Sequence, residues 1–291
     1  MKKRETFDTV RVFGSVPQPE VRLVFVVGCP RSGTTWVLGI LESHDDVAIA
    51  TPETLRQKDP SEHGSRESKL FIGKDFDAIH KSLSTIYPPR EAKEKAFSVG
   101  AFALCGLAGR TGAKVIAEKT PTHLWRAHEI AFFFPESRFI NVLRDGRDVC
   151  VSMLEAHKGW GRDWAPGTLE DAAKLWADSV ELAKKMEEKL PPERWITARY
   201  EELLREPIDN IVKLFEFAGL PVDREKAEAI HEENRGGAKA WFKGVFRKGV
   251  SGEWRQRFSP EDRRKFNEIA GRQLILAGYE SSNSWIENAD D

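Results

Sequence analysis

The sequence has little of what secreted, metal-binding or disulfide-stabilised proteins need. It contains only three cysteines, Cys29, Cys105 and Cys150. Three cysteines form neither a disulfide framework nor a metal-binding quartet, and we expect them to be buried thiols in a reducing compartment. The seven histidines are scattered and show no metal-ligand spacing, so no metal is expected.

Long apolar runs and an excess of one charge are also missing. The longest apolar stretch, Leu23–Gly28, is far too short to span a bilayer. The start of the chain, MKKRETFDTVRVFG, has no apolar run before Glu5 and Asp8, which is not the pattern of a signal peptide. The net charge is −1, so any anion site must be local. We therefore expect a cytoplasmic protein with no nucleic-acid or membrane partner; the oligomeric state is not indicated.

What is present is a globular composition, 40% hydrophobic and 31% charged, without repeats or low-complexity linkers. A single domain over residues 1–291 is expected. Short apolar runs predict strands at Arg22–Gly28, Ala113–Ala117, Arg138–Leu143 and Trp195–Ala198. Helical patterns separate them, at 122–134, 146–157 and 168–190. This alternation predicts a P-loop-like α/β fold of three layers, α/β/α, around a central parallel sheet.

The C-terminal third is predicted to be helical, at 208–218, 224–234 and 260–276. Ser259 before Pro260 is a good N-cap with proline at the first helical position, and Gly278 ends the same helix. Between these helices, Arg235–Trp254 is rich in glycine and basic residues. A loop of this length inside a compact domain is typically functional.

The segment GCPRSGTTW, Gly28–Trp36, follows the first predicted strand and opens a helix. A glycine turn between strand and helix gathers backbone N–H groups and the positive helix end around one point, which binds phosphate. The glycines have Walker A spacing, but Thr34 stands where the Walker lysine would follow Gly33. The loop offers a cation and hydroxyls instead, from Arg31, Ser32, Thr34 and Thr35. It therefore fits one phosphate with an attached anionic group better than a triphosphate.

Two further basic elements predict a second anion site. Arg144 follows the strand at 138–143, in LRDGRDVCVS, and Ser152 comes eight residues later. An arginine fork and a serine hydroxyl suit a phosphate, although Arg144 beside two aspartates also suits a salt-bridged helix start. The third element is FRKGVSGEW, where Arg247, Lys248 and the N–H of Gly249 would close over the same anion. A plain basic surface loop is the alternative there.

These motifs occur in one order, PRSGTTW, RDGRDVCVS and FRKGVSGEW, with a fourth, ITARYEELLREP, at Ile196–Pro207. Together they resemble the sulfotransferase family that uses 3′-phosphoadenosine 5′-phosphosulfate (PAPS), over about Leu23 to Tyr279. The resemblance implies an enzyme that transfers a sulfuryl group from PAPS, as co-substrate, to a hydroxyl or amine acceptor. In-line positioning and charge neutralisation should suffice for this reaction without a metal.

The resemblance also implies a donor site. The 5′-phosphosulfate would be held by Pro30, Arg31, Ser32, Gly33, Thr34 and Thr35, with Arg31 where cytosolic members usually have lysine. Trp36 and Tyr200 would contact the adenine, although Trp36 equally suits a core aromatic. The 3′-phosphate would be held by Arg144, Ser152, Arg247, Lys248 and Gly249, and Phe246 would also belong to the cofactor-binding site.

The catalytic base departs from the pattern of the small-molecule cytosolic members. Those members carry a histidine after a Lys-Thr pair, whereas here Pro121 follows Lys119 and Thr120. The segment HDDVAIATPETL resembles the one in which carbohydrate and tyrosylprotein members carry a glutamate, and Glu53 holds that position. We therefore predict Glu53 as general base, with His123 as the fallback. Lys119 would be the cation at the bridging oxygen, and Arg31 would neutralise the transferred group.

Two other function classes stay open at this point, a P-loop nucleotide or nucleoside kinase and a non-catalytic nucleotide-binding protein of the same fold. The acceptor is open as well, as a small-molecule, glycan or peptide hydroxyl. Segments 54–72, 159–168 and 236–245 are expected to line its pocket. They carry Trp160, Trp164, Trp241 and Phe242, which favour an apolar or aromatic-contacting acceptor.

Overall fold

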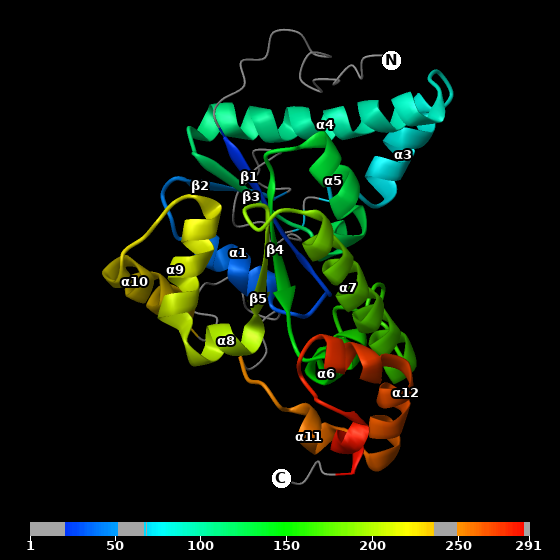
Figure 1. Ribbon diagram of the computed structural model, residues 1–291. Coiled ribbons are helices and arrows are strands. Elements are labelled where there is room, and N and C mark those ends of the chain that lie inside the picture. Colours follow the sequence, from blue (N-terminus) through cyan, green and yellow to red (C-terminus); the bar gives the residue numbers. More distant parts are fainter. Residues whose placement is uncertain (1–20, 52–66, 68, 236–248, 288–291) are drawn as a thin grey trace, which may run out of the picture.

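The computed structural model describes residues 21–51, 67, 69–235 and 249–287. Five strands form one sheet in the order β2-β3-β1-β4-β5 (Figure 1). Every neighbouring pair runs parallel. The strands are β1 (Arg22–Gly28), β2 (Val47–Ala50), β3 (Val115–Lys119), β4 (Arg138–Leu143) and β5 (Trp195–Arg199). The predicted central parallel sheet is confirmed.

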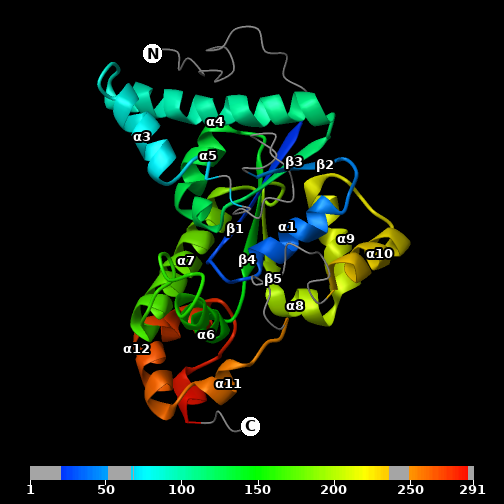
Figure 2. The ribbon, with the colours of Figure 1, turned by 180° about the vertical axis from the view of Figure 1, so that it is seen from behind.

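Helices cover both faces of the sheet, as the continuous apolar run of β1 requires. Val24 and Val26 point into one core, whereas Phe25 and Val27 point into the other. The first face carries α1 (Thr34–Glu42), α8 (Tyr200–Arg205), α9 (Pro207–Ala218) and α10 (Arg224–Asn234). The second carries α3 (Lys74–Leu83), α4 (Pro89–Thr111), α5 (Ala127–Phe133) and α7 (Leu169–Lys189). Figures 1 and 2 show these layers from opposite sides, and the three-layer fold is confirmed.

A third apolar cluster lies beyond the carboxyl ends of the strands and contains the helical C-terminal part (Figure 1). It joins α7 to α6 (Gly146–His157), α11 (Trp254–Arg257), α12 (Pro260–Leu276) and the 3₁₀ helix η5 (Asn283–Ile286). The predicted start of α12 is confirmed, because the Ser259 hydroxyl accepts from the N–H of Asp262 in a capping box. None of the helices within the described ranges is long and apolar enough to cross a bilayer.

Two of the predicted elements differ clearly from their counterparts in the structure. The strand predicted at 113–117 lies two residues later, at Val115–Lys119. The single helix predicted at 122–134 is instead the 3₁₀ helix η2 (Pro121–Arg126) followed by α5. This shift matters for the site, because it makes Lys119 the last residue of β3.

Candidate active site

Most of the predicted site residues that the structure describes lie at the carboxyl edge of the sheet, where parallel sheets place their ligand crevices. The strand order sets their order along this edge. Lys119 ends β3, the loop 28–33 leaves the central strand β1, Arg144 follows β4, and Tyr200 follows β5. The phosphate loop therefore lies between Lys119 on one side and Arg144 on the other.

Two glycines give the loop its shape. Gly28 has φ 145°, and a Cβ placed there would lie 2.5 Å from the carbonyl oxygen of Val142. Gly33 has φ 101°, and a Cβ there would lie 2.7 Å from Cδ2 of Tyr200. Arg31 between them also adopts a left-handed conformation, with φ 73°, which is strained for a residue with a side chain. Such strain is typical of functional loops.

The loop presents polar groups that suit an anion. The N–H of Ser32 donates to the carbonyl of Cys29 at 3.1 Å and closes the turn. The Ser32 hydroxyl is buried and, within the described part of the chain, has no hydrogen-bond partner. Thr34 and Thr35 begin α1, so their N–H groups belong to the turn that a helix leaves open, at its positive end. This cradle would bind a phosphate or sulfate group.

The loop does not offer a thiolate. Burial raises the pKa of Cys29 to about 12, although Ser179 stabilises its charged form by a hydrogen bond. The thiol is therefore neutral at physiological pH and is a poor nucleophile. No three His, Cys, Asp or Glu side chains come together as metal ligands within the described ranges.

Arg31 connects the loop to two later segments. Its Nε donates to the hydroxyl of Ser152 on α6 at 3.1 Å. Its guanidinium carbon also lies 5.2 Å from the ring centroid of Trp160. The structure thus brings together residues that the sequence predicted for the two phosphates of one ligand.

Arg144 links three parts of the edge. Its Nη1 donates to the carbonyl of Arg31 at 3.3 Å, and its Nη2 donates to the carbonyl of Val250 at 3.0 Å. Its guanidinium carbon lies 4.4 Å from the ring centroid of Tyr200. The remaining nitrogen, Nε, is buried and has no hydrogen-bond partner among the described residues.

Tyr200 also contacts Trp36, with ring centroids 5.6 Å apart and an edge-to-face angle of 72°. Both rings are buried. Burial raises the pKa of Tyr200 in spite of the opposing charge of Arg144, so its phenol is neutral. The structure pairs the two predicted adenine-contacting residues, and it also places both within the core against α1. Their contact with adenine stays a prediction.

Lys119 has a carboxylate partner that the sequence did not indicate. Its Nζ, in a side chain only 4% exposed, lies 3.5 Å from the Glu67 carboxylate. Next in the sequence, the Thr120 hydroxyl accepts from the N–H of Lys69 at 3.1 Å. Glu67 and Lys69 therefore both contact the end of β3 and the residue after it.

The chain leaves β2 beside the same lysine. Ala50 pairs with Glu118 in the register of β2 and β3, so Thr51 follows β2 at the position opposite Lys119. Glu53 comes two residues later in the sequence and lies outside the described residues.

His123, the fallback base, is fully buried rather than open to the edge. Its Nδ1 lies 2.7 Å from Oε2 of Glu118, and its Nε2 accepts from the N–H of Phe71 at 3.4 Å. Glu118 also accepts from Thr120 at 2.6 Å. Both ring nitrogens are thus engaged in a buried network, the usual environment of a structural histidine.

Several predicted residues lie outside the described part of the chain: Glu53, Trp241, Phe242, Phe246, Arg247 and Lys248. Gly249, the last residue of the basic motif, is described and has φ 62°. Val250 follows it and accepts the hydrogen bond from Arg144. The end of this motif therefore reaches Arg144, although the two are about a hundred residues apart in the sequence.

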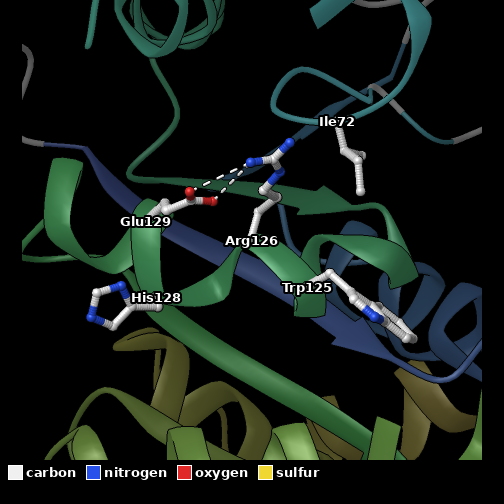
Figure 3. Close-up of a pocket in the computed structure, with 5 residues that line it drawn as sticks. All are labelled: Ile72, Trp125, Arg126, His128 and Glu129. Carbon is white, nitrogen blue, oxygen red and sulfur yellow. Dashed lines mark hydrogen bonds and ion pairs between the residues drawn. The ribbon is translucent and has the colours of Figure 1, made fainter. Parts of the chain in front are cut away.

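A cavity of about 570 Å³ lies beside η2 and α5, which follow Lys119 in the chain. Figure 3 shows Ile72, Trp125, Arg126, His128 and Glu129 around it. Arg126 donates to both carboxylate oxygens of Glu129, at 3.4 and 3.2 Å. Arg126 thus has a carboxylate partner within the wall of the cavity.

A sequence model described as "Sulfotransferase family" matches residues 24–224. The chain is 25% identical over 279 residues to a putative protein-tyrosine sulfotransferase of Caenorhabditis briggsae, covering 90% of this chain and 91% of that protein. It is 28% identical over 174 residues to carbohydrate sulfotransferase 5 of Mus musculus, covering 53% of this chain but only 44% of that protein.

A solved structure of a mouse sulfotransferase complexed with 3′,5′-diphosphoadenosine (PAP) shares the fold, with a TM-score of 0.54 and 18% identity. The alignment covers 88% of this chain and 85% of that one. Because the family model spans more than half of the sequence, this chain belongs to the sulfotransferase family, as its motifs indicated.

Proposed function

We propose that this protein is a sulfotransferase that transfers the sulfuryl group of PAPS to a hydroxyl acceptor. The observation that carries the proposal is the bridge made by Arg144, which contacts the phosphate loop at Arg31 and the end of the basic motif at Val250. An arginine in this position joins two anion-binding elements. PAPS has two such groups, a 5′-phosphosulfate and a 3′-phosphate.

The polar atoms at the site fit such a donor. Among the described residues, Ser32 Oγ and Arg144 Nε are buried without hydrogen-bond partners, and native proteins rarely leave such atoms unsatisfied. Ser32 Oγ belongs to the phosphate loop, and Arg144 Nε belongs to the arginine that contacts the end of the basic motif. A nucleotide with a phosphate at each end would satisfy both. The PAP in the structurally similar mouse sulfotransferase supports the same donor.

The residues at the edge can supply what sulfuryl transfer needs. Arg31 and the N–H groups that begin α1 would neutralise charge on the transferred group. Lys119, beside the loop, would neutralise the oxygen that bridges the phosphate and the sulfuryl group. We propose Glu53 as the base that removes the acceptor proton, since Thr51, two residues before it in the sequence, follows β2 opposite Lys119. His123 is the alternative base, although its nitrogens are already engaged with Glu118 and Phe71.

We propose that the acceptor approaches beside an exposed aromatic pair. Trp160 and Trp164 are 55% and 44% exposed, and their ring centroids lie 5.3 Å apart. Trp160 also contacts Arg31 of the phosphate loop. Flat apolar faces at this position favour an acceptor with a ring. The names of the relatives point to carbohydrate and protein-tyrosine acceptors, and both carry rings.

The direct test is transfer of radioactive sulfate from labelled PAPS to a panel of phenols, alkyl alcohols, sugars and tyrosyl peptides. We expect at least one ring-bearing hydroxyl to become labelled and Glu53→Gln to abolish the transfer. A parallel titration compares 3′,5′-diphosphoadenosine (PAP) with ATP. Tighter binding of ATP, with phosphoryl transfer and no labelled product, would show a kinase instead.

A further inference from the structure

Asp148 makes an unusual pair of hydrogen bonds at the back of the donor site. It lies in the first turn of α6, and its side chain is completely buried. Its Oδ2 accepts from the N–H of Gly252 at 2.7 Å, and its Oδ1 accepts from the N–H of Trp254 at 3.0 Å. One carboxylate therefore holds two backbone groups of a segment more than a hundred residues away.

The segment held in this way is the one that continues the basic motif. In Figures 1 and 2 its orange trace starts beside α8 and runs to α11. Trp254 anchors its far end in the core, where the guanidinium of Arg147 stacks 3.8 Å from the centre of a Trp254 ring. Gly252 has φ 82°, and Val250 accepts from Arg144. The two hydrogen bonds of Asp148 thus lie between the core anchor and the contact with Arg144.

The charge of Asp148 is in the wrong place for an electrostatic role in donor binding. Its carboxylate lies 3.9 Å from Nη2 of Arg144, the arginine predicted to hold the 3′-phosphate. A negative charge so near a phosphate site repels the phosphate and weakens its binding. Burial also disfavours the charged form and raises the pKa of Asp148, against the effect of the two N–H groups and Arg144. The charge of Asp148 therefore cannot favour the phosphate directly, whereas its hydrogen bonds and its ion pair with Arg144 can hold neighbouring groups in place.

We propose that Asp148 is a positioning residue that sets the selectivity of the site for nucleotides with a 3′-phosphate. It does so by fixing the backbone from Gly249 to Gly252 against Arg144, so that this arginine and the end of the basic motif are in place before the donor binds. This inference rests on the proposed function, because it concerns the same donor.

The test compares Asp148→Asn with the wild-type protein by calorimetric titration with PAP and with adenosine 5′-monophosphate. Asparagine keeps the size but can accept from only one of the two N–H groups. We expect PAP affinity to fall by at least about tenfold, the equivalent of one charge-assisted hydrogen bond, with adenosine 5′-monophosphate affinity unchanged. A purely electrostatic role predicts the opposite sign, because removing the negative charge would tighten PAP binding. Unchanged or tighter PAP binding, or equal losses for both nucleotides, overturns the proposal.

A second variant perturbs the same segment without touching the carboxylate. Gly252→Ala disfavours the left-handed backbone at φ 82° and brings a Cβ 3.0 Å from the mobile end of Arg255. It should show the same selective loss of PAP binding. Asp178→Asn is the matched control, the same substitution at an exposed aspartate of α7 that pairs with Lys174 of its own helix. It should leave both affinities unchanged.

The outcomes separate this inference from the proposed donor. If the wild-type protein binds PAP no better than adenosine 5′-monophosphate, the donor itself is wrong and the inference falls with it. If the wild-type protein prefers PAP and both variants keep the preference, only the role of Asp148 is refuted.

Discussion

Arg144 lies with its guanidinium carbon 4.4 Å from the centre of the Tyr200 ring while its Nη1 donates to the carbonyl of Arg31. The first contact joins the ends of β4 and β5, and the second joins β4 to the phosphate loop. The Tyr200 ring in turn occupies the space that a side chain at Gly33 would need. These three neighbouring strand ends therefore form one packed unit around the proposed donor.

The ring of Tyr200 should matter more than its hydroxyl for this unit. Tyr200→Leu removes the cation–π contact with Arg144, which is worth roughly 0.5–2 kcal/mol at a site of this kind. We expect PAP affinity to fall by the corresponding factor, about 2- to 30-fold. Tyr200→Phe keeps the ring and serves as the control, with affinity close to wild type. Equal losses in the two variants would show that the hydroxyl carries the effect.

The loop glycines should not tolerate alanine. Gly28→Ala forces φ 145° on a residue with a side chain and places its Cβ 2.5 Å from backbone that cannot move freely. We expect a loss of about 1–3 kcal/mol in the unfolding free energy measured by chemical denaturation, together with loss of PAP binding. Gly109→Ala is the matched control, because its Cβ meets nothing within 4 Å on helix α4. That variant should gain about 0.5–1 kcal/mol.

The two candidate bases should give opposite patterns. Glu53→Gln should lower kcat by about 10²–10⁴-fold with unchanged PAP affinity and unchanged stability. His123→Ala leaves a buried acceptor on Glu118 without its partner, so it should lower the unfolding free energy by about 1–3 kcal/mol. Its kcat, measured where the variant stays folded, should remain within a few-fold of wild type. The reverse pattern in kcat would identify His123 as the base.

Glu201 gives the stability a definite dependence on pH. Burial raises its carboxyl pKa above the ordinary 4.5, against hydrogen bonds from the N–H of Asp145 and the hydroxyl of Tyr279. Between 4.5 and the raised pKa, the folded protein holds a proton that the unfolded chain releases. The unfolding free energy therefore falls as the pH rises through this window.

Glu201→Gln removes this titration. We measure the unfolding free energy of variant and wild type by denaturant titration from about pH 4 to about pH 8. As the pH rises, the variant should become more stable relative to the wild type. Glu188→Gln, on the exposed side of α7, should show no such trend. A difference for Glu201→Gln that stays constant over the whole range would contradict the prediction.

Trp164 offers a test of the acceptor side alone. Its ring packs against Trp160, whereas it is Trp160 that stacks with Arg31 of the phosphate loop. Trp164→Ala should therefore raise the KM for a ring-bearing acceptor by about 2- to 13-fold, as expected for losing one aromatic contact of about 0.5–1.5 kcal/mol. The affinity for PAP should not change. If the variant instead loses PAP affinity and keeps its KM for the acceptor, this aromatic pair belongs to the donor site.

Most of the sheet could be predicted because its strands are apolar runs that end at motif residues. Arg22–Gly28 and Arg138–Leu143 match β1 and β4. β2 was not predicted, because it is only four residues long, VAIA, at the edge of the sheet. The 23-residue helix α4 was missed as well, because its apolar residues do not follow one clear helical face.

Only the site residues that lie within sequence motifs could be predicted. Arg31, Ser152 and Arg144 could be assigned to one ligand from sequence order, and the structure brings them into contact. The partner of Lys119, Glu67, could not be found in this way, since a carboxylate in a loop carries no pattern. The hydrogen bonds that Asp148 accepts from Gly252 and Trp254 could not be predicted either, because their donors are backbone N–H groups, which every residue type except proline has.

The strand order β2-β3-β1-β4-β5 has a consequence for folding. Neighbouring strands at the centre are distant in sequence, so the proposed donor site takes its parts from segments spread between Gly28 and Val250. No short fragment of the chain holds all of these parts, so we expect only the assembled sheet to bind the nucleotide. Ligand binding and global unfolding are therefore linked: PAP at a hundred times its Kd should raise the unfolding free energy by about 2.7 kcal/mol.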